Sequence, residues 1–138
     1  MITASIVVYH TAARELLRVI NCAVRSAIEI LYIIDNSSND SLRELKDVSE
    51  KIVYIHSDNL GYGSGHNIGI KKAVEKGATY HVVLNPDIYW NDFVIEALSR
   101  FMDSYPDCGL VMPQILYPNG NIQYLCKLLP TPMDLFGR

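Results

Sequence analysis

A carboxylate directly after a predicted buried strand is the most informative feature of this sequence. The run Tyr80–Leu84 is mostly apolar and β-branched, which predicts a buried strand. It ends in Asn85-Pro86-Asp87, where the proline cannot continue a sheet ladder. Because ligands of open α/β sheets bind outside the carboxyl ends of the strands, Asp87 would meet a phosphate-bound metal there. The same tripeptide also suits a plain strand-ending turn.

Three further polar segments follow predicted strands and converge on the same edge. Tyr9-His10-Thr11 follows the first strand, and the small polar residues Asp35–Asp40 follow the second. Side chains of Asp and Asn can accept hydrogen bonds from a base or a ribose hydroxyl. In Asn59–Gly65, Gly61 and Gly63 permit close backbone approach, and the following helix start offers N–H groups to a diphosphate. Helix caps, a solvated turn or tight helix packing would explain the same residues structurally.

Alternating strands and helices position these segments. Strands are predicted at residues 5–9, 28–34, 52–56, 80–84 and 110–112, and helices at 12–27, 40–48 and 66–76. A last helix, capped by Asn91 or Asp92, ends before Pro106, and Asn119-Gly120 predicts a hairpin with a type I′ turn. This order predicts an α/β fold with a mainly parallel sheet and helices on both faces.

Composition indicates a soluble globular domain. The chain has 138 residues, of which 49% are hydrophobic and 20% charged. Its net charge of −3 gives no general attraction to nucleic acid. Three cysteines without metal-ligand spacing indicate free thiols in a reducing compartment, and Met1–Ala4 lacks the basic region of a signal peptide. We therefore expect a cytoplasmic protein.

Asp87 is the candidate metal ligand. A nucleoside diphosphate arrives with Mg²⁺ or Mn²⁺, and both cations prefer oxygen ligands. One carboxylate, phosphate oxygens and waters form an ordinary ligand set for such an ion. The histidines do not suggest zinc, because they are scattered and lack cysteines at useful spacing: His10, His56, His66 and His81.

Taken together, these motifs resemble the family 2 glycosyltransferases. The resemblance rests on Ile6–Tyr9, Asp35–Asp40, Asn59–Gly69 and Leu84–Asp87, in this order and spacing. Within the family, the chain is most similar to the rhamnosyltransferase-like branch of bacterial surface-polysaccharide enzymes. The resemblance implies a GT-A fold with a Rossmann-like nucleotide-binding half. It also implies inverting sugar transfer from a UDP- or dTDP-type donor to a saccharide or lipid-linked acceptor. Such an acceptor is compatible with peripheral association at the inner face of the membrane.

The resemblance also implies roles for single residues. Asp35 would face the crevice and bind the base or ribose, and Tyr9 would lie near the base. Asn85-Pro86-Asp87 occupies the place of the family's Asp-x-Asp motif, with Asp87 as ligand of the metal and the ribose-diphosphate. The expected nucleotide-binding residues are Tyr9, Asp35, Asn36, Ser37, Gly61, Gly63, Asn67, Asn85 and Asp87.

The resemblance divides the chain at residue 112. Residues 1–112 would form the donor-binding α/β core, and residues 113–138 the start of an acceptor-side region. In the family, a carboxylate of the acceptor half deprotonates the acceptor hydroxyl. We expect that base beyond Arg138 and do not assign it to Asp134, so no catalytic residue is named. The chain is accordingly expected to be a donor-binding portion that binds donor without transferring sugar.

Two other classes remain open. Gly63, Gly65 and Gly69 follow a strand, and Asp87 lies at a suitable distance for a ribose contact, which would fit an NAD-type dinucleotide-binding oxidoreductase. That glycine segment, however, belongs to the third strand–helix unit rather than the first. A non-catalytic nucleotide-binding domain is the second alternative. Tight NADH binding without UDP or dTDP binding would favour the former, and donor turnover would exclude the latter.

Overall fold

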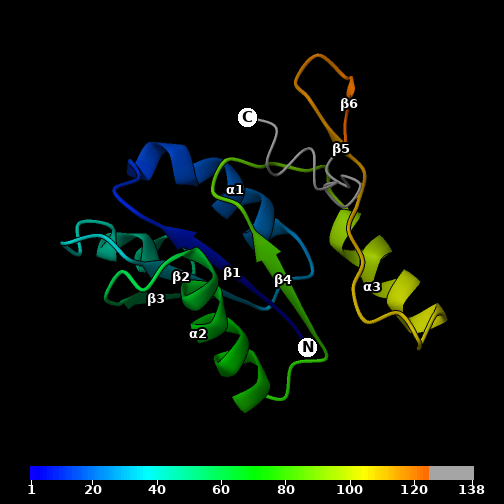
Figure 1. Ribbon diagram of the computed structural model, residues 1–138, viewed down its shortest axis with the longest axis horizontal. Helices are drawn as coiled ribbons and strands as arrows, with labels where there is room; N and C mark the ends of the chain where they lie inside the picture. The colour runs from blue at the N-terminus through cyan, green and yellow to red at the C-terminus, as the bar shows by residue number, and fades with distance from the viewer. Residues whose placement is uncertain (125–138) are drawn as a thin grey trace, which may run out of the picture.

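The protein forms a parallel α/β sheet. The computed structural model describes residues 1–124; Asp134 and the rest of residues 125–138, in the predicted acceptor-side region, lie outside the described residues. The four strands are β1 (Ile2–Val8), β2 (Ile30–Asp35), β3 (Ile52–His56) and β4 (Tyr80–Leu84). They run parallel in the order β3-β2-β1-β4 (Figure 1). The predicted α/β class with a mainly parallel sheet is confirmed.

Helices cover both faces of the sheet. Helix α1 (Ala13–Arg25) connects β1 to β2, the 3₁₀ helix η1 (Arg43–Val48) connects β2 to β3, and α2 (Tyr62–Glu75) connects β3 to β4. Figure 1 shows α1 and α2 on opposite sides of the strands, with α3 (Val94–Ser104) beyond β4. Strand β1 has β2 as its neighbour on one edge and β4 on the other, so the strand order switches direction at β1. A crevice is expected at the carboxyl end of β1 for this reason.

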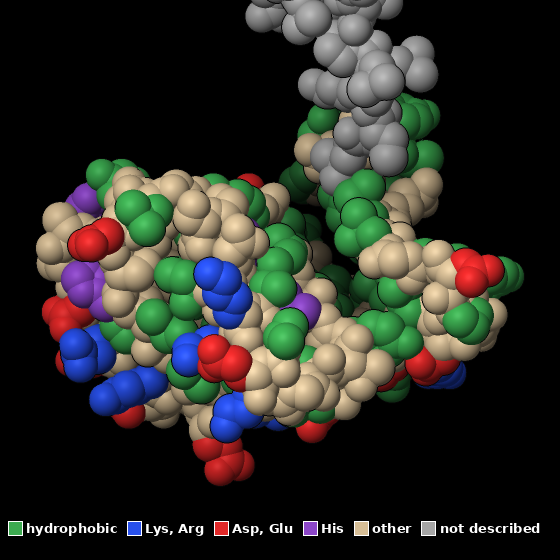
Figure 2. Space-filling model, turned by 60° about the horizontal axis from the view of Figure 1, so that its bottom comes forward, with side chains coloured by type: hydrophobic (Ala, Val, Ile, Leu, Met, Phe, Trp, Pro, Cys, Tyr) green, Lys and Arg blue, Asp and Glu red, His purple; other side chains and the backbone are tan. Residues whose placement is uncertain are grey.

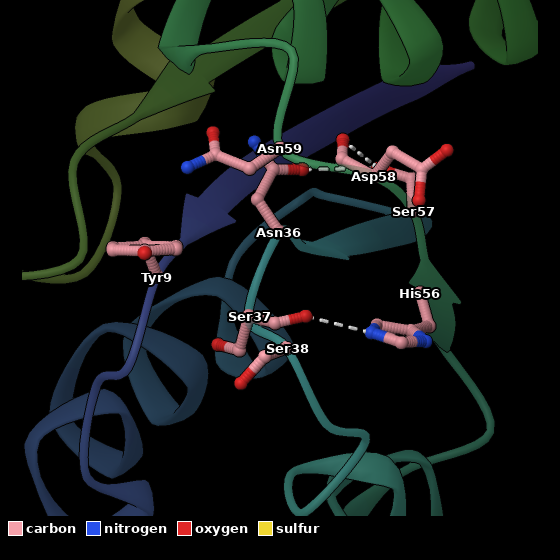
Figure 3. A pocket seen from close by; sticks show the side chains of 8 residues that line it. All are labelled: Tyr9, Asn36, Ser37, Ser38, His56, Ser57, Asp58 and Asn59. Atoms are coloured by element: carbon pink, nitrogen blue, oxygen red, sulfur yellow. Dashed lines mark hydrogen bonds between the residues drawn. The ribbon is translucent and has the colours of Figure 1, made fainter.

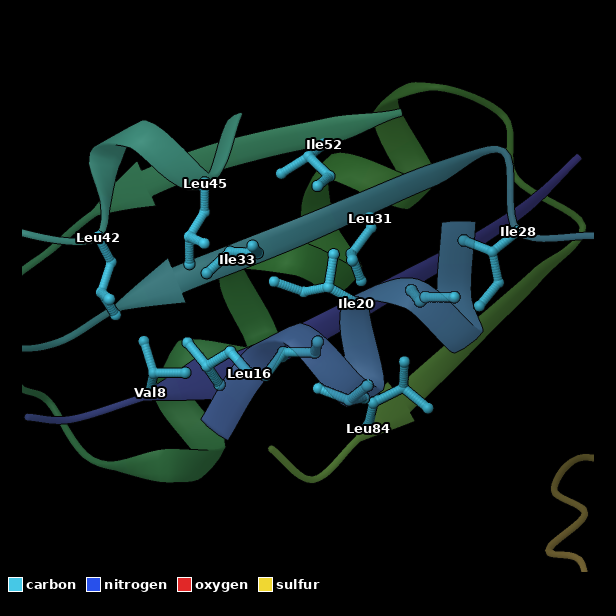
Figure 4. Close-up of a cluster of buried hydrophobic side chains, with 14 of the residues drawn as sticks. Val8, Leu16, Ile20, Ile28, Leu31, Ile33, Leu42, Leu45, Ile52 and Leu84 are labelled. Atoms are coloured by element: carbon cyan, nitrogen blue, oxygen red, sulfur yellow. The ribbon is translucent and has the colours of Figure 1, made fainter. Parts of the chain in front are cut away.

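The main core lies between the sheet and α1 (Figure 4). Strand side chains alternate, so Ile6 and Val8 of β1 join Leu31 and Ile33 of β2 on this face. Helix α1 contributes a buried stripe of Leu16, Val19, Ile20 and Ala23. Burying one such aliphatic side chain stabilises the fold by roughly 1.5–3 kcal/mol. This packing fixes the strands whose ends carry the polar segments.

Helix α2 packs unusually close to β1 on the other face. A Cβ atom at Gly65 would lie 2.8 Å from the methyl groups of Val7, and one at Gly69 would lie 2.6 Å from Cβ of Ser5. The helix begins at Tyr62, four residues before the predicted start, and Gly61 at φ +92° precedes it. Gly63 and Gly65 are therefore helical, contrary to the predicted loop. Close packing on β1 requires small residues at Gly65 and Gly69, whereas a Cβ at Gly63 would meet no atom within 4 Å.

Two local predictions between β4 and the hairpin are wrong. Residues 110–112 form no strand, since a three-residue apolar run finds no neighbouring strand among the described residues, and Leu110 is exposed. Neither Asn91 nor Asp92 caps α3; Phe93 precedes the helix at φ +74°, and Asp92 lies 3.8 Å from Arg25.

The predicted hairpin is present, but its turn differs. Strands β5 (Ile115–Leu116) and β6 (Ile122–Gln123) are antiparallel. The N–H of Gly120 donates to the carbonyl of Tyr117 at 2.8 Å, and of the turn residues Gly120 alone has a positive φ, of 84°. A type I′ turn would need positive φ at both central residues. The turn is therefore type I with a glycine bulge, which suits the fixed φ of Pro118.

Charges of both signs are mixed on the face of the molecule that Figure 2 shows, where Lys and Arg side chains are interspersed with Asp and Glu. Among residues 1–124, no helix has both the length and the apolar character needed to cross a membrane.

Candidate functional site

A polar pocket lies at the carboxyl ends of β1, β2 and β3. Its volume is about 230 Å³. It is lined by Tyr9, Asn36, Ser37, Ser38, His56, Ser57, Asp58 and Asn59. Figure 3 shows Tyr9 at one end and His56 and Ser57 at the other, with Asn36 and Ser37 between them. The structure thus brings together Tyr9, Asn36 and Ser37, three of the residues that the sequence predicted for one site.

Hydrogen bonds between the strand ends hold this pocket. The backbone N–H of His10 donates to Oγ of Ser37 at 2.8 Å, joining the ends of β1 and β2. Nε2 of His56 lies 2.8 Å from the carbonyl oxygen of Ser37, so this nitrogen carries the proton. The Ser57 hydroxyl donates to Oδ1 of Asn36 at 2.9 Å, which leaves the amide N–H groups of Asn36 as donors. The polar lining of the pocket is therefore held in place by hydrogen bonds between the strand ends.

Asp35 does not face the crevice, contrary to the prediction. Its side chain is fully buried, and it is not part of the pocket wall. Oδ1 accepts a hydrogen bond from the Ser37 N–H at 2.9 Å, and Oδ2 accepts one from the Tyr54 hydroxyl at 2.8 Å. Burial and then the Asp35 carboxylate raise the pKa of Tyr54 well above its usual range. The position of Asp35 at the end of β2, which alternates toward the apolar core, explains this burial.

Asn85 and Asp87 lie on the other side of β1. Leu84 pairs with Ile6, so the segment after β4 emerges beside the end of β1. The hydroxyl of Tyr62, in the first turn of α2, donates to Oδ1 of Asn85. Burial and the negative charge of Asp87 raise the pKa of Tyr62. The first turn of α2 and the Asn-Pro-Asp segment are thus neighbours.

The Asp87 carboxylate suits a divalent cation that arrives with its own oxygens. The side chain is exposed, and no ion pair within residues 1–124 engages it. The described residues contain no group of three or more His, Cys, Asp or Glu side chains that could hold a metal alone. A metal at Asp87 would therefore need phosphate oxygens or waters as further ligands, which is usual for Mg²⁺ and Mn²⁺.

The glycines of the segment Asn59–Gly65 lie in two different environments. Gly61 and Gly63 are exposed, with no atom within 4 Å of an added Cβ, so they leave the α2 start open. Gly65 instead packs on β1. Asn67 is exposed and lines a second pocket of about 290 Å³, which shares Ser57 and Asp58 with the first. Asn67 is therefore a neighbour of the predicted site and not part of its wall.

Sequence reasoning missed several site residues. His56, Ser57 and Asp58 line the pocket, although the sequence treated them only as the end of a strand and its loop. The signal that could have identified them is the run of polar residues at the end of β3. Tyr62 had no such signal, since its partner Asn85 lies 23 residues along the chain.

An open parallel sheet with helices on both faces and a polar pocket at the carboxyl ends of its strands is the architecture of a doubly wound α/β domain. The chain belongs to glycosyl transferase family 2, whose family model matches residues 5–125. Among solved structures it is similar to the crystal structure of S. aureus TarS 1-349, with a TM-score of 0.58 and 16% identity. The match covers 75% of this chain and 33% of that chain. This likeness confirms the GT-A, Rossmann-like fold. No curated protein sequence matches the chain.

Proposed function

We propose that this domain binds the nucleotide-diphosphate sugar of an inverting glycosyltransferase in the rhamnosyltransferase-like branch. The observation that carries the proposal is the exposed carboxylate of Asp87 after β4, on the other side of β1 from a preformed polar pocket at the ends of β1 to β3. The family match supports a sugar-nucleotide ligand in general. The proposed donor is of UDP or dTDP type. The proposed acceptor is a saccharide or a lipid-linked saccharide, and the latter would bring the protein to the inner face of the membrane.

The nucleoside is proposed to occupy the polar pocket. The exposed ring of Tyr9 offers a stacking surface, and Asn36 and Ser37 offer hydrogen-bonding groups beside it. The diphosphate would extend toward the start of α2, where Gly61 and Gly63 leave backbone N–H groups accessible. Asp35 would act indirectly, because its carboxylate holds the Ser37 N–H.

Asp87 is proposed to hold Mg²⁺ or Mn²⁺, which would stabilise negative charge on the departing diphosphate. The N–H groups at the start of α2 would stabilise the same charge. Inversion requires direct displacement at the anomeric carbon by an acceptor hydroxyl that a general base activates. We assign this base to none of residues 1–124.

Calorimetry tests the proposal on the 138-residue chain. UDP and dTDP are titrated with and without Mn²⁺, with NADH as a third ligand. We expect Mn²⁺-dependent nucleotide binding that Asp87→Ala abolishes. Asp47→Ala is the matched control, because Asp47 is an exposed acid on η1, away from the pocket. Metal-independent binding, or an Asp87→Ala variant that binds like the wild type, would contradict the metal role. Binding of NADH alone would favour an oxidoreductase.

A further inference from the structure

A hydrogen bond joins the first turn of α2 to the segment after β4. The Tyr62 hydroxyl is the donor, and Oδ1 of Asn85 is the acceptor. Neither residue lines the polar pocket at the ends of β1 to β3. The bond lies next to Asp87, whose charge acts on the Tyr62 hydroxyl. It therefore belongs to the part of the site that would meet the diphosphate and the sugar.

Buried contacts fix the position of Tyr62. Its ring stands edge-on to the ring of His66, with centroids 4.5 Å apart and an interplanar angle of 76°. His66 is only 4% exposed, and its Nδ1 lies 2.7 Å from Oγ of Ser5 on β1. The same Ser5 oxygen lies 2.9 Å from Nε2 of His81 on β4. Helix α2 and strand β4 are thus anchored to one hydroxyl group, and this anchoring sets where Tyr62 meets Asn85.

The bond determines which atoms Asn85 presents to a ligand. An asparagine amide has one carbonyl oxygen, which accepts hydrogen bonds or binds metals, and one NH₂ group with two donors. Tyr62 takes one of the two acceptor positions of this oxygen and so holds the oxygen toward the first turn of α2. Burial together with the Asp87 charge raises the pKa of Tyr62, so the phenol remains a proton donor at neutral pH. On the exposed Asn85 side chain, the NH₂ group then lies on the side of the amide away from Tyr62. An NH₂ group does not bind Mg²⁺ or Mn²⁺, which take oxygen ligands.

We propose that Tyr62 is a positioning residue that orients Asn85 so that its NH₂ group donates to an oxygen of the sugar nucleotide. In this arrangement Asn85 recognises the ligand and Asp87 holds the metal. The accepting oxygen belongs to the diphosphate or to a hydroxyl of the donor sugar. This inference rests on the proposed donor-binding function and adds a role for two residues within it.

Four variants separate this role from a structural one: Tyr62→Phe, Asn85→Ala, Asn85→Asp and Tyr80→Phe. The last is the matched control, because the Tyr80 hydroxyl donates to Asp103 at 2.6 Å and so ties β4 to α3 away from the site. Affinities for UDP, UDP-glucose, dTDP and dTDP-rhamnose are measured by calorimetry in Mn²⁺. Tyr62→Phe and Asn85→Ala should each weaken binding about tenfold, while Tyr80→Phe leaves it unchanged.

Asn85→Asp gives the sharpest result. A carboxylate has no N–H donor, so this variant should bind the nucleotides more weakly even though it adds a second acid beside Asp87. Tighter Mn²⁺-dependent binding by Asn85→Asp would show that this position is a metal ligand and would overturn the proposal. Equal losses for UDP and UDP-glucose place the accepting oxygen on the diphosphate, whereas a loss for UDP-glucose alone places it on the sugar.

A second readout does not depend on ligand. The side-chain NH₂ resonances of Asn85 in an NMR ¹⁵N–¹H spectrum should shift in Tyr62→Phe and remain in place in Tyr80→Phe. If Tyr62→Phe leaves both these resonances and the affinities unchanged while Asp87→Ala abolishes binding, this inference fails and the proposed function stands. If the wild type binds none of the nucleotides, the proposed function itself fails, and this inference fails with it.

Discussion

The hydroxyl of Ser5 lies 2.7 Å from Nδ1 of His66, inside the layer between β1 and α2. The same hydroxyl contacts Nε2 of His81 at 2.9 Å, and Nδ1 of His81 lies 2.8 Å from Oγ1 of Thr3. Because a serine has one proton, Ser5 donates to one imidazole and accepts from the other. This arrangement suits two neutral rings. Burial lowers the pKa of both histidines, that of His81 to about 4, with the charge of His66 as a second cause for His81.

Acid should therefore destabilise the fold. His81 has its ordinary pKa of 6.5 when unfolded and about 4 when folded, so the unfolded chain binds more protons between these values. Its contribution is fully present above pH 6.5 and is lost as the pH falls toward 4. At about 1.4 kcal/mol per pH unit, this amounts to about 3 kcal/mol from His81, and His66 adds a loss of the same sign.

Urea unfolding across this pH range measures the effect. His10→Gln is the matched control, because His10 is exposed and its removal should leave the pH dependence intact. His81→Gln should flatten it. A free energy of unfolding that stays constant from neutral pH to about pH 4 would contradict this prediction.

Replacing Ser5 should destabilise the protein without any change at the surface. Ser5→Ala removes the shared partner of His66 and His81 and leaves a buried ring nitrogen of His66 and a partly buried one of His81 unpaired. The expected loss is about 1–3 kcal/mol in the free energy of unfolding, measured by urea denaturation. Ser41→Ala, an exposed serine, serves as control. Equal stabilities of the two variants would show that the network contributes nothing.

Two glycines of α2 should respond oppositely to alanine. A Cβ at Gly69 would lie 2.6 Å from Cβ of Ser5, so Gly69→Ala must displace α2 and should cost about 1–3 kcal/mol. Gly63 has no atom within 4 Å of an added Cβ, so Gly63→Ala should stabilise the helix by about 0.5–1 kcal/mol. Thermal unfolding of both variants checks the pair. Similar melting temperatures would contradict the close packing of α2 on β1.

Asp35 should matter for stability as well as for nucleotide binding. Asp35→Ala leaves the Ser37 N–H and the partly buried Tyr54 hydroxyl without their partner, which should cost about 1–3 kcal/mol in the free energy of unfolding. Tyr54→Phe removes one of these bonds and should cost less. In the folded fraction, Asp35→Ala should also weaken UDP or dTDP binding, because Ser37 lines the pocket. Unchanged stability in denaturation experiments would mean that the carboxylate is not held as described.

The sequence by itself determined the strand order along the chain and the polar character of the strand ends. The bounds 52–56 and 80–84 match β3 and β4, because the side-chain alternation and flanking turn residues of a strand are local properties. The same local signals placed Tyr9, Asn36 and Ser37 at strand ends, and parallel pairing brings such ends to one edge.

Only the tertiary structure decided which way these side chains point and what they contact. Helix α2 begins at Tyr62 and not at the predicted residue 66, and its glycines Gly65 and Gly69 pack against β1. The sequence alone does not reveal whether a glycine belongs to a loop or to a close contact between a helix and a strand. Ser5 meets His66 across 61 residues of sequence. Such a partner follows from which faces pack together, since the sequence pattern specifies a face but not the residue opposite it.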